Sequence, residues 1–146
     1  MTTGAAAEPA IDAFNQVCFK AGQTASEAHD RMAGLTGAPL PFTLTFWDKT
    51  LEPAPGTPAR IERRCEVLFS GDYTIAAEDA LRVQMARPPV FGFAIDLPDT
   101  HAPLPGTTLI EGRELLRGRV AVVHIGLRDG STFMAVDRLP AGWEAM

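Results

Sequence analysis

The sequence lacks the features that mark several large functional classes. No window approaches the roughly 20 consecutive apolar residues of a membrane-spanning helix, so we expect a soluble chain without membrane insertion. The phosphate-binding patterns Gly-x-Gly-x-x-Gly and Gly-x-x-x-x-Gly-Lys are both missing, so no nucleotide cofactor is expected. Gly-x-Ser-x-Gly is missing as well, which excludes the nucleophile turn typical of α/β hydrolases.

Positive charge is also scarce. The chain has 13 Lys and Arg residues against 18 Asp and Glu residues, and its formal net charge is −5. Such a balance does not attract polyanions, so we expect no nucleic-acid partner. Residues 1–10 contain no basic segment followed by an apolar run, so they do not resemble a signal peptide. A native cytoplasmic start and a start left by cleavage both stay open.

A length of 146 residues fits one domain with a sizeable core. We expect residues 1–8 to form a disordered N-terminus and residues 9–146 to form a single α+β domain. Expected helices cover 9–21, 24–34 and 72–86, and expected strands cover 42–47, 59–69, 90–97, 107–116 and the two arms of 119–139. This order predicts N-terminal helices, then a mostly antiparallel sheet of about five to six strands, with one helix inserted after the first two.

Local signals fix several of these elements. Thr24 and Glu27 have the spacing of a helix capping box, and Ala28, Met32 and Leu35 would face inward from the helix that follows. Gly112 is expected to bend the strand 107–116. In the strand 59–69, apolar residues alternate with the charged residues Arg60, Glu62, Arg64 and Glu66. This alternation predicts a half-buried strand whose charged face is solvated surface.

Asp129-Gly130 is a dipeptide favoured by two-residue type I′ turns, so it predicts a β-hairpin and fixes its register. The expected buried pairs are Leu127 with Thr132, Ile125 with Met134, and Val123 with Val136. The other face would pair Gly126 with Phe133, His124 with Ala135, and Val122 with Asp137. The ring of Phe133 would then cover the bare backbone at Gly126.

Cys18 and Cys65 are the two cysteines of the chain. Each lies on an apolar face, Cys18 on the first helix and Cys65 on the strand 59–69. We therefore expect their Cα atoms to lie within about 7 Å, the limit for a disulfide. A bridge and a pair of buried thiols both stay open, and a bridge would indicate an exported or periplasmic protein rather than a cytoplasmic one. A reactive thiolate is disfavoured, because such a group needs a partly exposed site.

Histidine and aspartate supply the remaining candidates for chemistry. Asp96, Asp99 and His101 share one loop, and His124 lies diagonally from Asp137 on the expected hairpin. Such groups can act as acid–base pairs. Their spacing matches no metal-ligand motif, and isolated histidines in apolar strands are usually structural. No metal site is therefore predicted.

Two classes of function stay open. The first is a non-enzymatic binding or interaction module for a protein partner or a small ligand, with Trp47, Phe91 and Phe93 as a candidate interface. The second is a small hydrolase or isomerase that uses His101 or His124 with Asp96, Asp99 or Asp137. Two of His29, His101 and His124 meeting at a carboxylate in one cleft would favour the second. For the first, single replacement of His101 or His124 by Ala should not abolish function.

Overall fold

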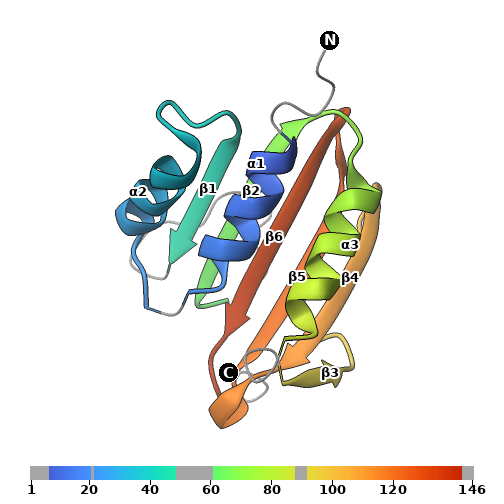
Figure 1. The fold of residues 1–146 in the computed structure, drawn as a ribbon. Coiled ribbons are helices and arrows are strands. Elements are labelled where there is room, and N and C mark those ends of the chain that lie inside the picture. The colour runs from blue at the N-terminus through green and yellow to red at the C-terminus, as the bar shows by residue number, and fades with distance from the viewer. Residues whose placement is uncertain (1–6, 21, 49–60, 88–91, 143–146) are drawn as a thin grey trace.

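The computed structural model describes residues 7–20, 22–48, 61–87 and 92–142, and within them six strands form one antiparallel sheet (Figure 1). The strands are β1 (Thr43–Asp48), β2 (Arg63–Ser70), β3 (Phe93–Ile95), β4 (Thr107–Glu114), β5 (Val120–Arg128) and β6 (Ser131–Leu139). Their order across the sheet is β1-β2-β6-β5-β4-β3. The expected α+β class is confirmed, including the helix between the second and third strands.

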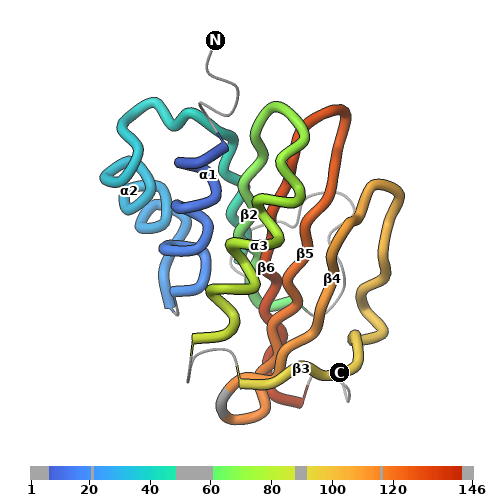
Figure 2. Tube along the Cα trace, turned by 45° about the vertical axis from the view of Figure 1, so that its right-hand side comes forward, coloured from blue at the N-terminus to red at the C-terminus, as the bar shows by residue number. Residues whose placement is uncertain are grey.

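The helices are α1 (Ala7–Ala13), α2 (Ala25–Thr36) and α3 (Thr74–Met85), with a π-helical turn at Phe14–Cys18 and a 3-10 turn at Leu116–Gly118. Figures 1 and 2 show α1 and α3 side by side over one face of the sheet, with α2 next to α1 at the β1 edge. No helix in the described ranges is long and apolar enough to cross a membrane. The three α-helices thus cover one face of the sheet.

The first helix differs from expectation at both ends. It begins at Ala7 rather than Pro9, so Ala7 and Glu8 are helical and not disordered, because the Ala7 side chain is buried. It leaves α-helical geometry at Phe14 and ends at Cys18 instead of residue 21. The wider π turn brings Phe14 and Cys18 into the core.

The second helix begins as its capping box predicts. The backbone N–H of Glu27 donates to the Thr24 hydroxyl, and the Glu27 carboxylate accepts from the backbone N–H of Thr24. Ala28 and Met32 are buried, but Leu35 is exposed, which corrects the prediction that it faces inward. Helical residues turn by about 100° each, so Leu35 points about 60° away from Met32 and leaves a narrow contact face.

The strands differ from expectation in three places. β2 starts at Arg63 instead of residue 59. β3 spans Phe93–Ile95, so it ends two residues before the expected end at residue 97. In β4 the irregularity lies between Thr107 and Leu109 and not at Gly112. The stretch 51–58, which the sequence predicts to be a proline-rich loop between two strands, and the residue Phe91 lie outside the described residues.

Apolar side chains are buried on both faces of the sheet. The larger cluster lies under the helices and includes Phe14, Val17, Met32, Val67, Leu81, Ile125, Met134 and Val136. A smaller cluster on the opposite face contains Ile61, Val120, Val122 and Leu139, with Trp47 packed against it. Because this second face is also largely buried, polar groups on it must find partners within the protein.

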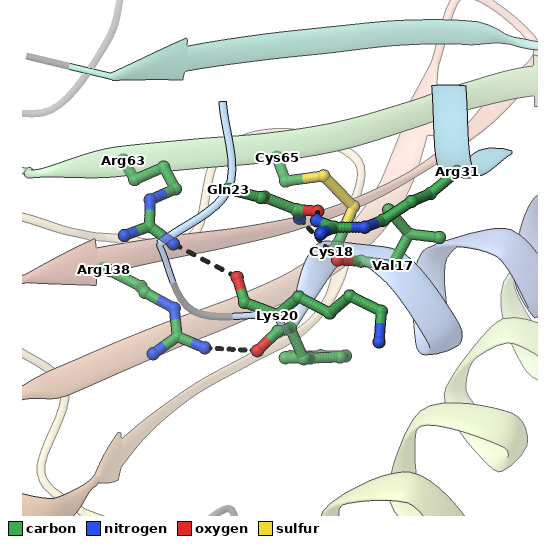
Figure 3. Close-up of a disulfide and its surroundings, with 9 residues drawn as sticks. Val17, Cys18, Lys20, Gln23, Arg31, Arg63, Cys65 and Arg138 are labelled. Carbon is green, nitrogen blue, oxygen red and sulfur yellow. Dashed lines mark hydrogen bonds between the residues drawn. A yellow bond between two sulfur atoms is a disulfide. The ribbon is translucent and has the colours of Figure 1, made fainter. Parts of the chain in front are cut away.

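Cys18 and Cys65 form a disulfide that ties the first helix to β2, and their Cα atoms are 5.4 Å apart (Figure 3). The prediction that they meet in the core is confirmed. Both side chains are buried among the residues of the larger apolar cluster. The bridge therefore fixes which end of β2 lies beneath the end of the first helix.

The hairpin forms with the predicted register. Asp129 and Gly130 occupy the turn with φ values of 52° and 80°, the left-handed geometry that a type I′ turn requires. All six predicted pairs are present between β5 and β6. Leu127 is half-buried rather than buried, because it lies next to the exposed turn.

Gly126 is a position where the hairpin needs a residue without a side chain. A β-carbon there would lie 2.6 Å from the Gly106 carbonyl oxygen and 2.7 Å from the ring of Phe133. We expect Gly126→Ala to lower the free energy of unfolding by about 1–3 kcal/mol, since overpacking of this kind forces the backbone apart. Urea denaturation measures the change. Gly34→Ala is the control, because no atom lies within 4 Å of its added methyl group and alanine favours the helix. Equal stability of the two variants would contradict the prediction.

Candidate functional site

A buried polar network lies on the sheet face opposite the helices. Its members are Arg64 from β2, Asp137 from β6, His124 from β5 and His101 from the β3–β4 loop (residues 96–106). Arg64 and Asp137 are directly opposite in the β2–β6 ladder. His124 is diagonal to Asp137, since Val122 is the residue that pairs with it. Strand register therefore positions three of the four groups.

Asp137 is the centre of this network, and its side chain is 0% exposed. Arg64 binds it through two parallel hydrogen bonds, Nε to Oδ1 at 2.6 Å and Nη2 to Oδ2 at 2.7 Å. His101 Nε2 lies 2.8 Å from the same Oδ2, and His124 Nε2 lies 3.4 Å from it. The buried carboxylate on β6 thus contacts side chains from β2, from β5 and from the β3–β4 loop.

The charge state of Asp137 follows from these contacts. Burial alone would raise the pKa of its carboxyl group, but the hydrogen bonds from Arg64 and His101 and the contact with His124 outweigh burial and hold the pKa well below its usual range. For Arg64, burial lowers the pKa, and the bonds to Asp137 reverse that effect and raise it. The pair is therefore ionised at every ordinary pH.

His101 has partners at both ring nitrogens. Nε2 faces Asp137, and Nδ1 lies 2.7 Å from the Thr100 hydroxyl. The backbone N–H of His101 donates to the Pro98 carbonyl at 3.0 Å, and its side chain is 2% exposed. Both ring nitrogens and the backbone N–H of His101 thus have partners in the protein, and these contacts fix the loop in place.

His124 is the more accessible histidine, with 14% of its side chain exposed. Its Nε2 atom is buried and makes no well-formed hydrogen bond within the described residues, because the 3.4 Å contact with Asp137 is long. The ring packs edge-to-face on Phe133 and on His101, with centroid distances of 5.8 Å and 6.3 Å. His124 is therefore held mainly by packing.

A second ion pair continues the network along the same face. Glu66 is buried and accepts hydrogen bonds from Arg128 Nη1 and Nη2 at 3.1 Å and 3.3 Å. The Arg128 guanidinium lies 4.7 Å from the centroid of Phe133. The prediction that Arg64 and Glu66 belong to a solvated face is therefore wrong. β2 lies inside the sheet, between β1 and β6. Arg64 therefore contacts Asp137 on β6, and Glu66 contacts Arg128 on β5.

The structure brings together three of the candidate residues, His101, His124 and Asp137, and separates the others. Asp96 and Asp99 are exposed, and His101 turns to Asp137 instead of to them. His29 is exposed beside Asp30, with 3.8 Å between their nearest atoms. Of the candidate interface residues, Trp47 packs against the smaller apolar cluster, Phe93 is exposed, and Phe91 is outside the described ranges.

Sequence reasoning missed Arg64 and Thr100. Nothing local indicates that β2 pairs with β6, and this pairing alone places Arg64 against Asp137, 73 residues further along the chain. Thr100 carries no signal beyond its position beside His101. The diagonal relation between His124 and Asp137, by contrast, followed directly from the predicted turn.

The described residues hold no group of three or more His, Cys, Asp or Glu side chains arranged to bind a metal ion. A surface pocket of about 300 Å³ lies where β1 begins and β2 ends. It is lined by Leu40, Pro41, Phe42, Thr43, Leu68, Phe69, Ser70 and Ser131, so none of the network residues contributes to it.

Comparison with known proteins gives no relative from which to transfer a function: no family model, curated protein or solved structure matches the chain.

Proposed function

We propose that this protein is a non-enzymatic binding module and that its buried polar network is structural. One observation carries the proposal: the groups of the network are turned toward one another. Both ring nitrogens of His101 and both carboxylate oxygens of Asp137 contact other protein groups. A general acid or base must instead present an atom to the substrate.

The network gives the module a rigid binding loop. The contact between His101 and Asp137 fixes the β3–β4 loop on the sheet, and this loop presents Leu104, which is 71% exposed. The neighbouring edge strand β3 presents Phe93, which is 60% exposed. Loops held on a rigid scaffold commonly carry recognition residues. We therefore assign recognition of a protein partner to Leu104 and Phe93.

Quantitative affinity purification from an extract of the source cells tests this function. We expect Leu104→Ser to reduce recovery of a specific partner about tenfold, as for an interface anchor, and His124→Gln to leave recovery nearly unchanged. Thermal unfolding of both variants checks that the fold survives. If His124→Gln abolishes recovery while Leu104→Ser does not, the assignment of the interface is wrong.

A small hydrolase or isomerase is the second candidate. It is favoured by the convergence of His101 and His124 on Asp137, since a buried carboxylate orients the imidazole in many acid–base sites. His124 would be the reacting group, because it is the more exposed of the two. A screen with simple esters and ketones decides the matter: turnover that falls about a hundredfold in a folded His124→Ala variant would establish the enzyme and displace the binding module.

We also propose that the protein resides in an oxidising compartment, such as the periplasm. The support is the buried bridge between Cys18 and Cys65, since such disulfides persist outside the reducing cytoplasm. The mass of the protein purified from its source, without added reductant, tests this location. A reduced pair in that material would contradict it.

A further inference from the structure

Three arginines gather at one end of the sheet, on the face covered by the helices. Arg63 in β2 and Arg138 in β6 are directly opposite in the antiparallel ladder. Arg119 immediately precedes β5, in which Ala121 pairs with Arg138. Burial lowers the pKa of Arg138, and the charges of Arg63 and Arg119 lower it further, so both groups lie close enough to Arg138 to repel it. Like charges placed opposite each other destabilise a sheet.

The end of the first helix compensates part of this charge. Arg138 Nη2 donates to the Phe19 carbonyl at 2.7 Å, and Arg63 Nη1 donates to the Lys20 carbonyl at 3.2 Å. Figure 3 shows the guanidinium groups of Arg63 and Arg138 side by side, each with one nitrogen directed at the helix end. Carbonyls at a helix C-terminus carry partial negative charge, so these contacts stabilise the arginines but do not neutralise them.

Two carboxylates of the described residues lie near the three guanidinium groups: Asp48 is directly opposite Arg63 in the β1–β2 ladder, and Glu62 lies beside Arg119. The Glu62 Oε2 atom lies 3.8 Å from Arg119 Nη1, a distance too long for a hydrogen bond. Three guanidinium groups against these two carboxylates leave positive charge in excess at this end of the sheet, in a chain whose formal net charge is −5. The excess is local and does not follow from the overall composition.

Arg138 also has an unused donor. Its Nε atom is buried and has no acceptor within the described part of the chain. A guanidinium has five N–H donors in a planar fork that matches the oxygens of phosphate and carboxylate groups. The Arg119 side chain is 49% exposed, so the cluster is accessible from solvent. An anion with several oxygens would satisfy the buried donor and the excess charge together.

We propose that Arg63, Arg119 and Arg138 bind a phosphoryl group, either as free phosphate or as the phosphate ester of a small molecule. Such a group accepts charge-assisted hydrogen bonds from several guanidinium groups at once. The proposal names a ligand class for the binding module and rests on that function. It uses a different face and different residues from the recognition site assigned to Leu104 and Phe93.

Titration of the isotope-labelled, full-length protein with inorganic phosphate tests the site, followed by NMR and by calorimetry. We expect phosphate to change the amide chemical shifts at the start of β2 and at the end of β6. We also expect the affinity for phosphate to fall about tenfold in Arg119→Gln, the loss typical for one charged hydrogen bond. Arg119→Lys should recover part of it. Arg82→Gln is the matched control, because Arg82 is exposed on α3. Phenyl phosphate in a parallel titration distinguishes an ester ligand, which binds more tightly than phosphate, from the free ion.

Two outcomes would overturn the proposal. One is the absence of shifts at these strand ends when phosphate is added to the wild-type protein. The other is an equal affinity for phosphate in Arg119→Gln and Arg82→Gln. Either result would leave Arg63 and Arg138 as caps of the first helix and nothing more. Arg119 is half-exposed, so its replacement is expected to leave the fold intact, and thermal unfolding of the variant checks this. Partner recovery by the Leu104 variant is a separate readout, so the two proposals can fail independently.

Discussion

Replacement of both Cys18 and Cys65 by alanine is expected to lower the free energy of unfolding by about 4 kcal/mol. The two residues are 47 positions apart, and a bridge across a loop of this length removes much of the entropy of the unfolded chain. Single domains are stable by about 5–15 kcal/mol, so the loss is a large share of the total. Urea denaturation of the two proteins under the same non-reducing conditions measures it.

The wild-type protein under reducing conditions is the control for this prediction. Complete reduction should raise its mass by about two daltons, one hydrogen for each sulfur, and should lower its stability toward that of the alanine variant. Because both sulfur atoms are buried, reduction should require partial unfolding and proceed slowly without denaturant. A double variant as stable as the oxidised protein would show that the bridge does not hold the first helix to the sheet.

Asp137→Asn is expected to lower the free energy of unfolding by about 3–5 kcal/mol at neutral pH. The change removes one partner of a buried ion pair and leaves the Arg64 guanidinium without its counter-charge. The amide also cannot accept two parallel hydrogen bonds as the carboxylate does. Asp79→Asn is the matched control, because Asp79 is exposed on α3, and its stability should stay close to that of the wild-type protein.

The pH dependence of this effect has a definite sign. The pKa of Asp137 is lowered in the folded protein, so its contribution is complete above the unfolded value of about 4 and is lost as the pH falls below it. The difference in stability between the wild-type protein and Asp137→Asn should therefore be constant near neutral pH and shrink on acidification below about pH 4. Urea denaturation at several pH values measures the difference. A gap that widens in acid would contradict the assigned charge state.

Features fixed by neighbouring residues could be predicted from the sequence. The Asp129-Gly130 turn determined the register of β5 and β6, because a type I′ turn leaves no freedom in the pairing that follows. The capping box at Thr24 determined where α2 begins. The pairing of Cys18 with Cys65 followed from two apolar faces that share one core.

Features that depend on distant strands could not be predicted in the same way. Arg64 has the pattern of a solvated residue, and it is buried against Asp137 because β2 pairs with β6. His101 has acidic neighbours in its own loop, yet the tertiary fold turns it toward Asp137, 36 residues away in sequence. The sheet face opposite the helices becomes buried only when the fold is complete, so its burial leaves no periodic pattern of apolar residues in the sequence of β2.

The position of β6 in the sheet also has a consequence for how the chain is made. β6 is the last strand in the sequence, yet it lies between β2 and β5 and joins the β1–β2 hairpin to the β3–β4–β5 meander. During synthesis these two groups of strands therefore cannot join into one sheet until β6 has emerged from the ribosome. Cys18 and Cys65 both precede β3 in the chain, so the bridge between them does not depend on the pairing of β6. Assembly of the complete sheet is therefore expected only once β6 is available to join its two parts.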